Sequence, residues 1–190
     1  DIKKRATNPR KISVVGRIRK AKGQRDVMEA IAPLLSQNPN WEIQFIGTID
    51  RPAYADEIRA IAAAAQVENQ IQFVSLTNQI EHYYQESTAV VVASYSEGFS
   101  LVCIEAMACG STTVATEQVG IHSEVITHGV DGFLYPKGSI TALRTILEEV
   151  IQTPEKIDPK TARQTIVDHW SITTAAQKLF ETYNQFRNHK

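Results

Sequence analysis

The chain has 190 residues, of which 43% are hydrophobic, and this is enough for one domain with a substantial core. Its formal net charge of −1 argues against a general nucleic-acid binder, which needs an excess of Lys and Arg. The sequence shows neither a signal-peptide pattern nor an apolar run long enough to span a bilayer.

Strand-like and helix-like segments alternate along the chain. Expected strands are 11–16, 41–47, 70–74, 88–93, 112–116 and 132–135. Expected helices are 23–35, 53–67, 78–86, 100–107, 122–127, 139–151, 159–169 and 172–186. This alternation predicts an α/β fold, namely a Rossmann-like, doubly wound parallel sheet of about six strands followed by C-terminal helices.

The most informative segment joins the apolar run Ala89–Ala93 to the helix expected at 100–107. The N–H groups at the start of that helix point beyond the carboxyl end of the strand and favour anions. Glu105 lies among apolar and small residues, so we expect the helix to be packed on most sides and this carboxylate to have a polar partner. The segment therefore predicts a pocket for a ligand that carries hydroxyl and phosphate groups.

Three motifs in this chain resemble those of the retaining, GT-B-fold glycosyltransferases of family 4. Their two-glutamate signature is similar to Glu97-Gly98-Phe99 followed by Glu105-Ala106-Met107-Ala108-Cys109-Gly110. Their phosphate-binding stretch resembles Val15-Gly16-Arg17 followed by Lys22-Gly23, and their later sugar-side loop resembles the segment from Gly120 to Leu134. Each motif follows an expected strand, so the carboxyl edge of the sheet should bring all three into one cleft.

The resemblance implies a role for each candidate site residue. Arg17 and Lys22 would hold the donor diphosphate and stabilise the leaving nucleotide, and Glu97 would hold sugar hydroxyls; these three are the candidate catalytic residues. Glu105 would accept hydrogen bonds from the ribose hydroxyls. The other candidate substrate-binding residues are Gly16, Val74, Gly98, Phe99, Ser100, Leu101 and Gly120.

Several of these residues also have a structural interpretation. Glu97 could be a helix-capping acid, and Glu105 could be a salt-bridge partner on a helix face. Arg19, Lys20 and Arg25 are expected at the surface, and His122 is expected to be structural or solvated. Ser100 stands where the family usually has Gly.

The resemblance further implies that the chain is the C-terminal, donor-binding half of a two-domain hexosyltransferase. Residues 1–10 would be a linker and residues 11–190 the nucleotide-sugar-binding domain, with the N-terminal acceptor domain absent and the isolated domain inactive. A UDP- or GDP-linked sugar would be the substrate, no cofactor is expected, and no nucleic acid is expected as a partner. Peripheral membrane association of the full-length protein is left open.

No metal site is expected, because the sequence has no C-x-x-C, histidine cluster or Asp-x-Asp pattern. Cys103 and Cys109 are interpreted as reduced core thiols, which suits a cytoplasmic protein. The alternatives are a non-catalytic nucleotide-sugar-binding module and a sugar-nucleotide epimerase of similar fold. A Rossmann dehydrogenase is disfavoured, because no G-x-G-x-x-G follows the first expected strand.

Overall fold

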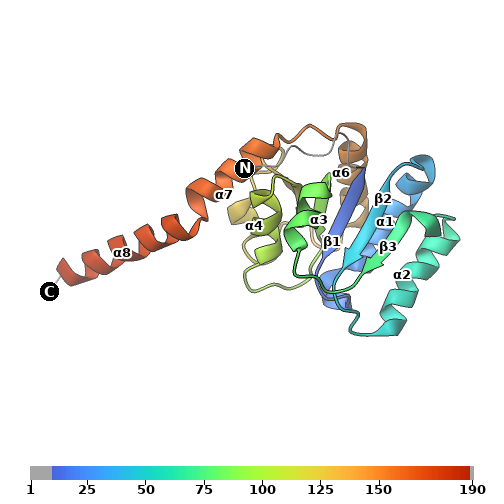
Figure 1. Ribbon diagram of the computed structural model, residues 1–190, viewed down its shortest axis with the longest axis horizontal. Coiled ribbons are helices and arrows are strands. Elements are labelled where there is room, and N and C mark those ends of the chain that lie inside the picture. Colours follow the sequence, from blue (N-terminus) through green and yellow to red (C-terminus); the bar gives the residue numbers. More distant parts are fainter. Residues whose placement is uncertain (1–9, 189–190) are drawn as a thin grey trace.

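The computed structural model describes residues 10–188, so the linker expected at residues 1–10 lies almost entirely outside the described residues. Six parallel strands form one sheet in the order β3-β2-β1-β4-β5-β6 (Figure 1). Each strand matches its predicted range to within one residue at either end. Their bounds are β1 Lys11–Val15, β2 Glu42–Ile46, β3 Ile71–Val74, β4 Ala89–Val92, β5 Thr112–Thr116 and β6 Phe133–Tyr135.

Helices cover both faces of this sheet, as the alternating pattern predicts. Helices α1, α2 and α6 pack together along one face, and α3 and α4 lie together on the other. The α-helices are α1 Gln24–Gln37, α2 Pro52–Ala64, α3 Ile80–Glu86, α4 Leu101–Ala108, α5 His122–Val125, α6 Ile140–Gln152, α7 Pro159–His169 and α8 Ile172–Asn188. Two short 3-10 helices, η1 at Lys20–Lys22 and η2 at Glu68–Gln70, are additions to the prediction.

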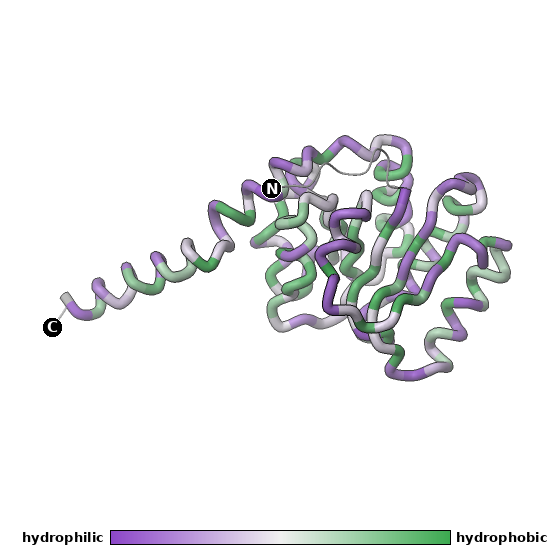
Figure 2. Tube along the Cα trace, in the orientation of Figure 1, coloured by the Kyte–Doolittle hydropathy of each residue, from purple (hydrophilic) through white to green (hydrophobic). Residues whose placement is uncertain are grey.

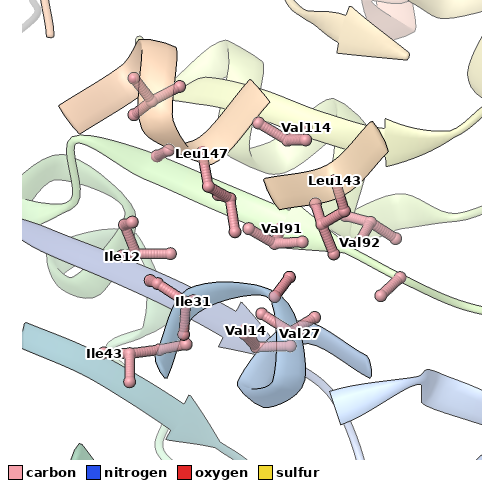
Figure 3. Close-up of a cluster of buried hydrophobic side chains, with 14 of the residues drawn as sticks. Ile12, Val14, Val27, Ile31, Ile43, Val91, Val92, Val114, Leu143 and Leu147 are labelled. Atoms are coloured by element: carbon pink, nitrogen blue, oxygen red, sulfur yellow. The ribbon is translucent and has the colours of Figure 1, made fainter. Parts of the chain in front are cut away.

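The main core lies between the sheet and the layer formed by α1 and α6. In Figure 3, Val27 and Ile31 of α1 lie against Ile12 and Val14 of β1, while α6 lies over β4 and β5. Most strand side chains are apolar because a parallel sheet covered on both faces keeps its central strands away from water; the exposed exceptions are Glu42 of β2 and Gln72 of β3. Strand β4, Ala89–Val92, is accordingly buried at every position.

Gly23 allows α1 to begin directly against the end of β4. Its φ is +67°, and a Cβ at this position would lie 2.1 Å from the carbonyl oxygen of Ala93. Because this close contact fixes the start of α1, it also fixes η1 and Lys22 beside the loop that follows β4.

Helix α8 extends away from the body of the molecule (Figure 1). Its apolar side chains recur at helical spacing, and Figure 2 shows green and purple segments alternating along it. Ile172, Leu179, Phe180, Tyr183 and Phe186 are between 61% and 88% exposed. Across the described residues, every helix is too short or too polar to cross a membrane.

We predict that Gly23→Ala lowers the free energy of unfolding by about 2–4 kcal/mol, because a left-handed Ala and an overpacked contact both cost energy. Urea unfolding measures this loss. Gly98→Ala is the matched control, since a Cβ there has no neighbour within 4 Å, and its effect should be within about 0.5 kcal/mol. Equal losses for the two variants would contradict the packing argument.

Candidate functional site

An ion pair joins the first two motifs at the carboxyl edge of the sheet. The Nζ of Lys22 lies 2.5 Å from Oε1 of Glu97, and Ser94 donates its hydroxyl to the same oxygen at 2.5 Å. Burial by itself raises the pKa of Glu97, but the hydrogen bonds from Lys22 and Ser94 outweigh it, and the pKa lies below its ordinary value. Glu97 is therefore held as a carboxylate that still has oxygen lone pairs for a ligand.

The cations after β1 are arranged around this pair in different ways. Arg17 is exposed, and within residues 10–188 its guanidinium has no carboxylate in ion-pair range. Arg19 lies 4.0 Å from Asp50, and Arg25 pairs with Glu29 at 2.8 Å. Arg19, Lys20 and Arg25 are exposed, as expected of surface residues. Among the described residues Arg17 thus has no ion-pair partner, whereas Lys22, five residues later, is paired with Glu97.

Gly16, predicted as a substrate contact, lies beside the alkyl chain of Lys22. A Cβ there would lie 3.6 Å from Cε of Lys22, which is an ordinary van der Waals distance. Its φ of +136° is what favours glycine at this position.

The N-terminus of α4 faces the same edge. The helix begins at Leu101, one residue later than predicted, because Ser100 adopts a left-handed conformation with φ 71° and ψ 64°. No side chain caps this end. In its first turn the N–H of Cys103 donates to the carbonyl oxygen of Ser100 at 3.2 Å, whereas the N–H groups of Leu101 and Val102 have no partner inside the helix and are available to an anion. Phe99 and Leu101 lie beside them and are 48% and 61% exposed.

His122 connects the third motif to the second. The side chain is fully buried, with Nε2 2.7 Å from the hydroxyl of Ser100 and Nδ1 2.7 Å from the carbonyl oxygen of Thr116. Burial lowers the pKa of His122 below its ordinary value. His122 was expected to be structural or solvated; its burial rules out the solvated alternative, and its partner Ser100 lies in the site.

Gly120 brings the third motif against Glu97. It has φ +56°, and a Cβ there would lie 3.2 Å from Cβ of Glu97. Gly98 lies on the loop of Glu97, where it is exposed and has open space around it. The contacts of Glu97 with Lys22 and Gly120, and of Ser100 with His122, thus confirm that the three motifs meet at one edge of the sheet.

The expectation that α4 is packed on most sides, with Glu105 among its buried residues, is wrong. The residue is exposed, because Cys103, Ala106 and Met107 form the buried side of the helix and Glu105 lies outside that side. The polar partner is nevertheless present: the hydroxyl of Tyr84 donates to Oε2 at 2.9 Å. Burial, followed by the charge of Glu105, raises the pKa of Tyr84, so its hydroxyl stays a donor.

Val74 lies at the end of β3, beside a hollow of about 380 Å³. This hollow is lined by the segment that follows β2 and by the end of β3 with the residues after it, namely Gly47, Thr48, Ile49, Phe73, Val74, Ser75 and Leu76. It has the polar backbone and apolar side chains that suit a flat ring.

Cys103 and Cys109 are both free; the first is buried and the second half-buried. Among the described residues, no group of three or more His, Cys, Asp or Glu side chains is placed to hold a metal ion.

Two site residues were not found by the sequence analysis. Ser94 lies three positions before Glu97, and Tyr84 lies on the short helix before β4, so their contacts depend on loop and helix geometry that no motif records.

With this geometry in place, comparison with known proteins identifies the class. Residues 1–165 match the family model described as glycosyl transferases group 1, and the chain belongs to this family. It is similar to the lipopolysaccharide core biosynthesis mannosyltransferase LpcC of Rhizobium leguminosarum, with 30% identity over 145 residues. It is also 30% identical over 148 residues to a D-inositol 3-phosphate glycosyltransferase of Frankia alni.

The match to the Rhizobium protein covers 75% of this chain but only 41% of that protein. The match to the Frankia protein covers 74% of this chain and 36% of that protein. The chain therefore spans less than half the length of these relatives.

Solved GT-B glycosyltransferases share the fold. HepE of Anabaena in complex with UDP has a TM-score of 0.83 and 25% identity, covering 94% of this chain and 49% of HepE. The C-terminal domain of LpcC from Francisella tularensis has a TM-score of 0.79 and 27% identity, covering 88% of this chain and 95% of that domain.

We predict that acid weakens the stabilising effect of Lys22. The folded pKa of Glu97 lies below 4.5, so its contribution is present above that pH and is lost as the pH falls through the folded pKa. In Lys22→Met the cation is lost while burial and the hydrogen bond from Ser94 remain, so the pKa of Glu97 should rise from its lowered value. The difference in unfolding free energy between wild type and Lys22→Met should therefore shrink on acidification.

Urea unfolding from neutral pH down to pH values below 4.5, where the folded carboxylate takes up its proton, measures this difference. Lys20→Met is the matched control, because Lys20 is an exposed cation in the same 3-10 helix, and its small effect should not change with pH. A Lys22→Met difference that stays constant across the range would refute the assignment of a charged pair.

Proposed function

We propose that this chain is the donor-binding half of a retaining GT-B glycosyltransferase of family 4. It would hold a UDP- or GDP-linked hexose for transfer to an acceptor hydroxyl. The observation that carries the proposal is the convergence of Lys22, Glu97 and the N-terminus of α4 at one edge of the sheet. Further support comes from the relatives, among them HepE, which was solved with UDP and with UDP-glucose.

Lys22, Arg17 and the first-turn N–H groups of α4 form the proposed diphosphate cradle. Arg17 can grip phosphate with two N–H groups, whereas Lys22 acts as a point charge. As the bond to the sugar breaks, negative charge grows on the nucleotide, and positive groups fixed in advance stabilise it without further reorganisation. These groups supply the charge compensation that a divalent ion would otherwise give, so we propose metal-independent binding.

The two glutamates serve different parts of the donor in this proposal. Glu97 is ionised and lies beside Lys22, so it would accept hydrogen bonds from sugar hydroxyls near the reacting carbon. Glu105 is exposed and oriented by Tyr84, and one carboxylate can accept from both ribose hydroxyls. The hollow beside Val74 would take the base.

The acceptor half is proposed to be a separate domain in the complete protein. The short coverage of the relatives supports this proposal, and so does the exposed apolar stripe of α8. One wall of a cleft binds a donor but cannot align it with an acceptor, and transfer depends on that alignment. An assay of sugar transfer by this chain alone tests the division, and efficient turnover would contradict it.

We predict that the chain binds a nucleoside diphosphate with and without EDTA. Calorimetry with UDP, GDP and ADP measures this, and at least one of UDP and GDP should bind. The positive groups of the cradle are all protein groups, so chelation should leave the affinity unchanged. Binding that disappears on chelation would refute the metal-free cradle, and no binding by any of the three would refute the donor site itself.

We predict that Glu105→Ala weakens free nucleotide and nucleotide-sugar alike, by about ten- to a hundredfold, because both lose charge-assisted hydrogen bonds. Glu97→Ala should weaken only the nucleotide-sugar, since the free nucleotide has no sugar. Titration of both variants with both ligands gives the comparison, and Glu148→Ala on α6 is the control. Equal losses of both ligands in Glu97→Ala would make Glu97 a structural acid.

A further inference from the structure

Ser100 holds a backbone conformation that side chains disfavour. Its φ of 71° is left-handed, and among the described non-glycine residues only Gln66 shares a positive φ. Glycine adopts this conformation without a steric penalty, whereas a Cβ crowds the following carbonyl group. Ser100 also precedes the first turn of α4, so its conformation sets the direction of the N–H groups there.

The hydroxyl of Ser100 contacts His122 and does not cap the helix. The carbonyl oxygen of Thr116 can only accept, so the 2.7 Å contact places the imidazole proton on Nδ1. Nε2 of the neutral ring is then an acceptor, and the hydroxyl of Ser100 must donate to it. Thr116, at the end of β5, thus fixes the ring, and the ring fixes Ser100.

We propose that His122 is a positioning residue that holds Ser100 in its left-handed conformation. The N–H groups of the first turn of α4 are thereby kept facing the donor diphosphate. The inference rests on the proposed function for the identity of that ligand, but the contacts themselves do not. The buried imidazole lies behind the helix end and does not touch the donor; it acts through Ser100.

If His122 has this role, the effect of removing it should depend on the residue at position 100, because a glycine there adopts the left-handed conformation without support from His122. His122→Asn keeps an N–H donor near the position of Nδ1 but loses the group that contacts Ser100. His122→Gln reaches the position of Nε2 and can still accept from Ser100. Ser100→Gly removes both the hydroxyl and the Cβ that makes the conformation costly.

The test is the affinity of the four variants for UDP and GDP by calorimetry. His122→Asn should lose about five- to thirtyfold, which corresponds to the penalty of a left-handed side chain. His122→Gln should stay within about threefold of wild type, because it can still accept from Ser100. Ser100→Gly is the background in which His122→Asn is repeated: the double variant Ser100→Gly, His122→Asn should bind within about threefold of Ser100→Gly alone. A general weakening of the fold by His122→Asn would persist in the double variant, and that result would overturn the proposal.

The amide NMR shifts of residues 99–103 in the unliganded chain give a second readout. They should move in His122→Asn relative to wild type, whereas the shifts of the double variant should match those of Ser100→Gly. If wild type binds no diphosphate, the proposed function fails, and these shifts still decide whether His122 holds Ser100. If His122→Asn does not fold, His122→Gln carries the test, and a loss above about tenfold in that variant overturns the proposal.

Discussion

Between β1 and β4 the order of the strands reverses, and the chain leaves these two neighbours toward opposite faces of the sheet. This geometry opens a crevice at their carboxyl ends, where no helix can lie across both strands. The loop after β1 carries Lys22 to one side, and the loop after β4 carries Glu97 to the other. Every other feature of the site is arranged around the contact that joins these two loops.

The two carboxylates of the signature show how position on one short segment separates two environments. Glu97 lies in the loop, where a half-buried cation and a hydroxyl converge on one of its oxygens. Glu105 lies on the outer side of α4, in contact with water and with Tyr84. A loop residue can be surrounded from several sides, whereas a residue on the outer face of a surface helix meets only what the adjacent helix provides.

The sequence predicted the strands to within a residue and the meeting of the three motifs, because both follow from patterns that sheet geometry enforces. It did not predict the exposure of Glu105, since an apolar neighbourhood along the chain does not say which side of a helix is covered. It could not place Ser94, Tyr84 or His122 beside their partners either. The Ser at position 100, where the family usually has Gly, was the one local signal of an unusual backbone there.

Helix α8 also affects how the stability of this chain can be measured. Its 17 residues pack mainly against α7 and little against the sheet, so its formation gains little from the main core. A helix of this length is close to the limit for independent stability in water. Ellipticity would therefore report the melting of α8 together with that of the body. The chain's second tryptophan, Trp170, lies two residues before α8, so in a Trp170→Phe variant the emission of Trp41, which is buried beside α1, would follow the body alone. The two signals need not coincide, and a single two-state fit to ellipticity would then understate the cooperativity of the sheet.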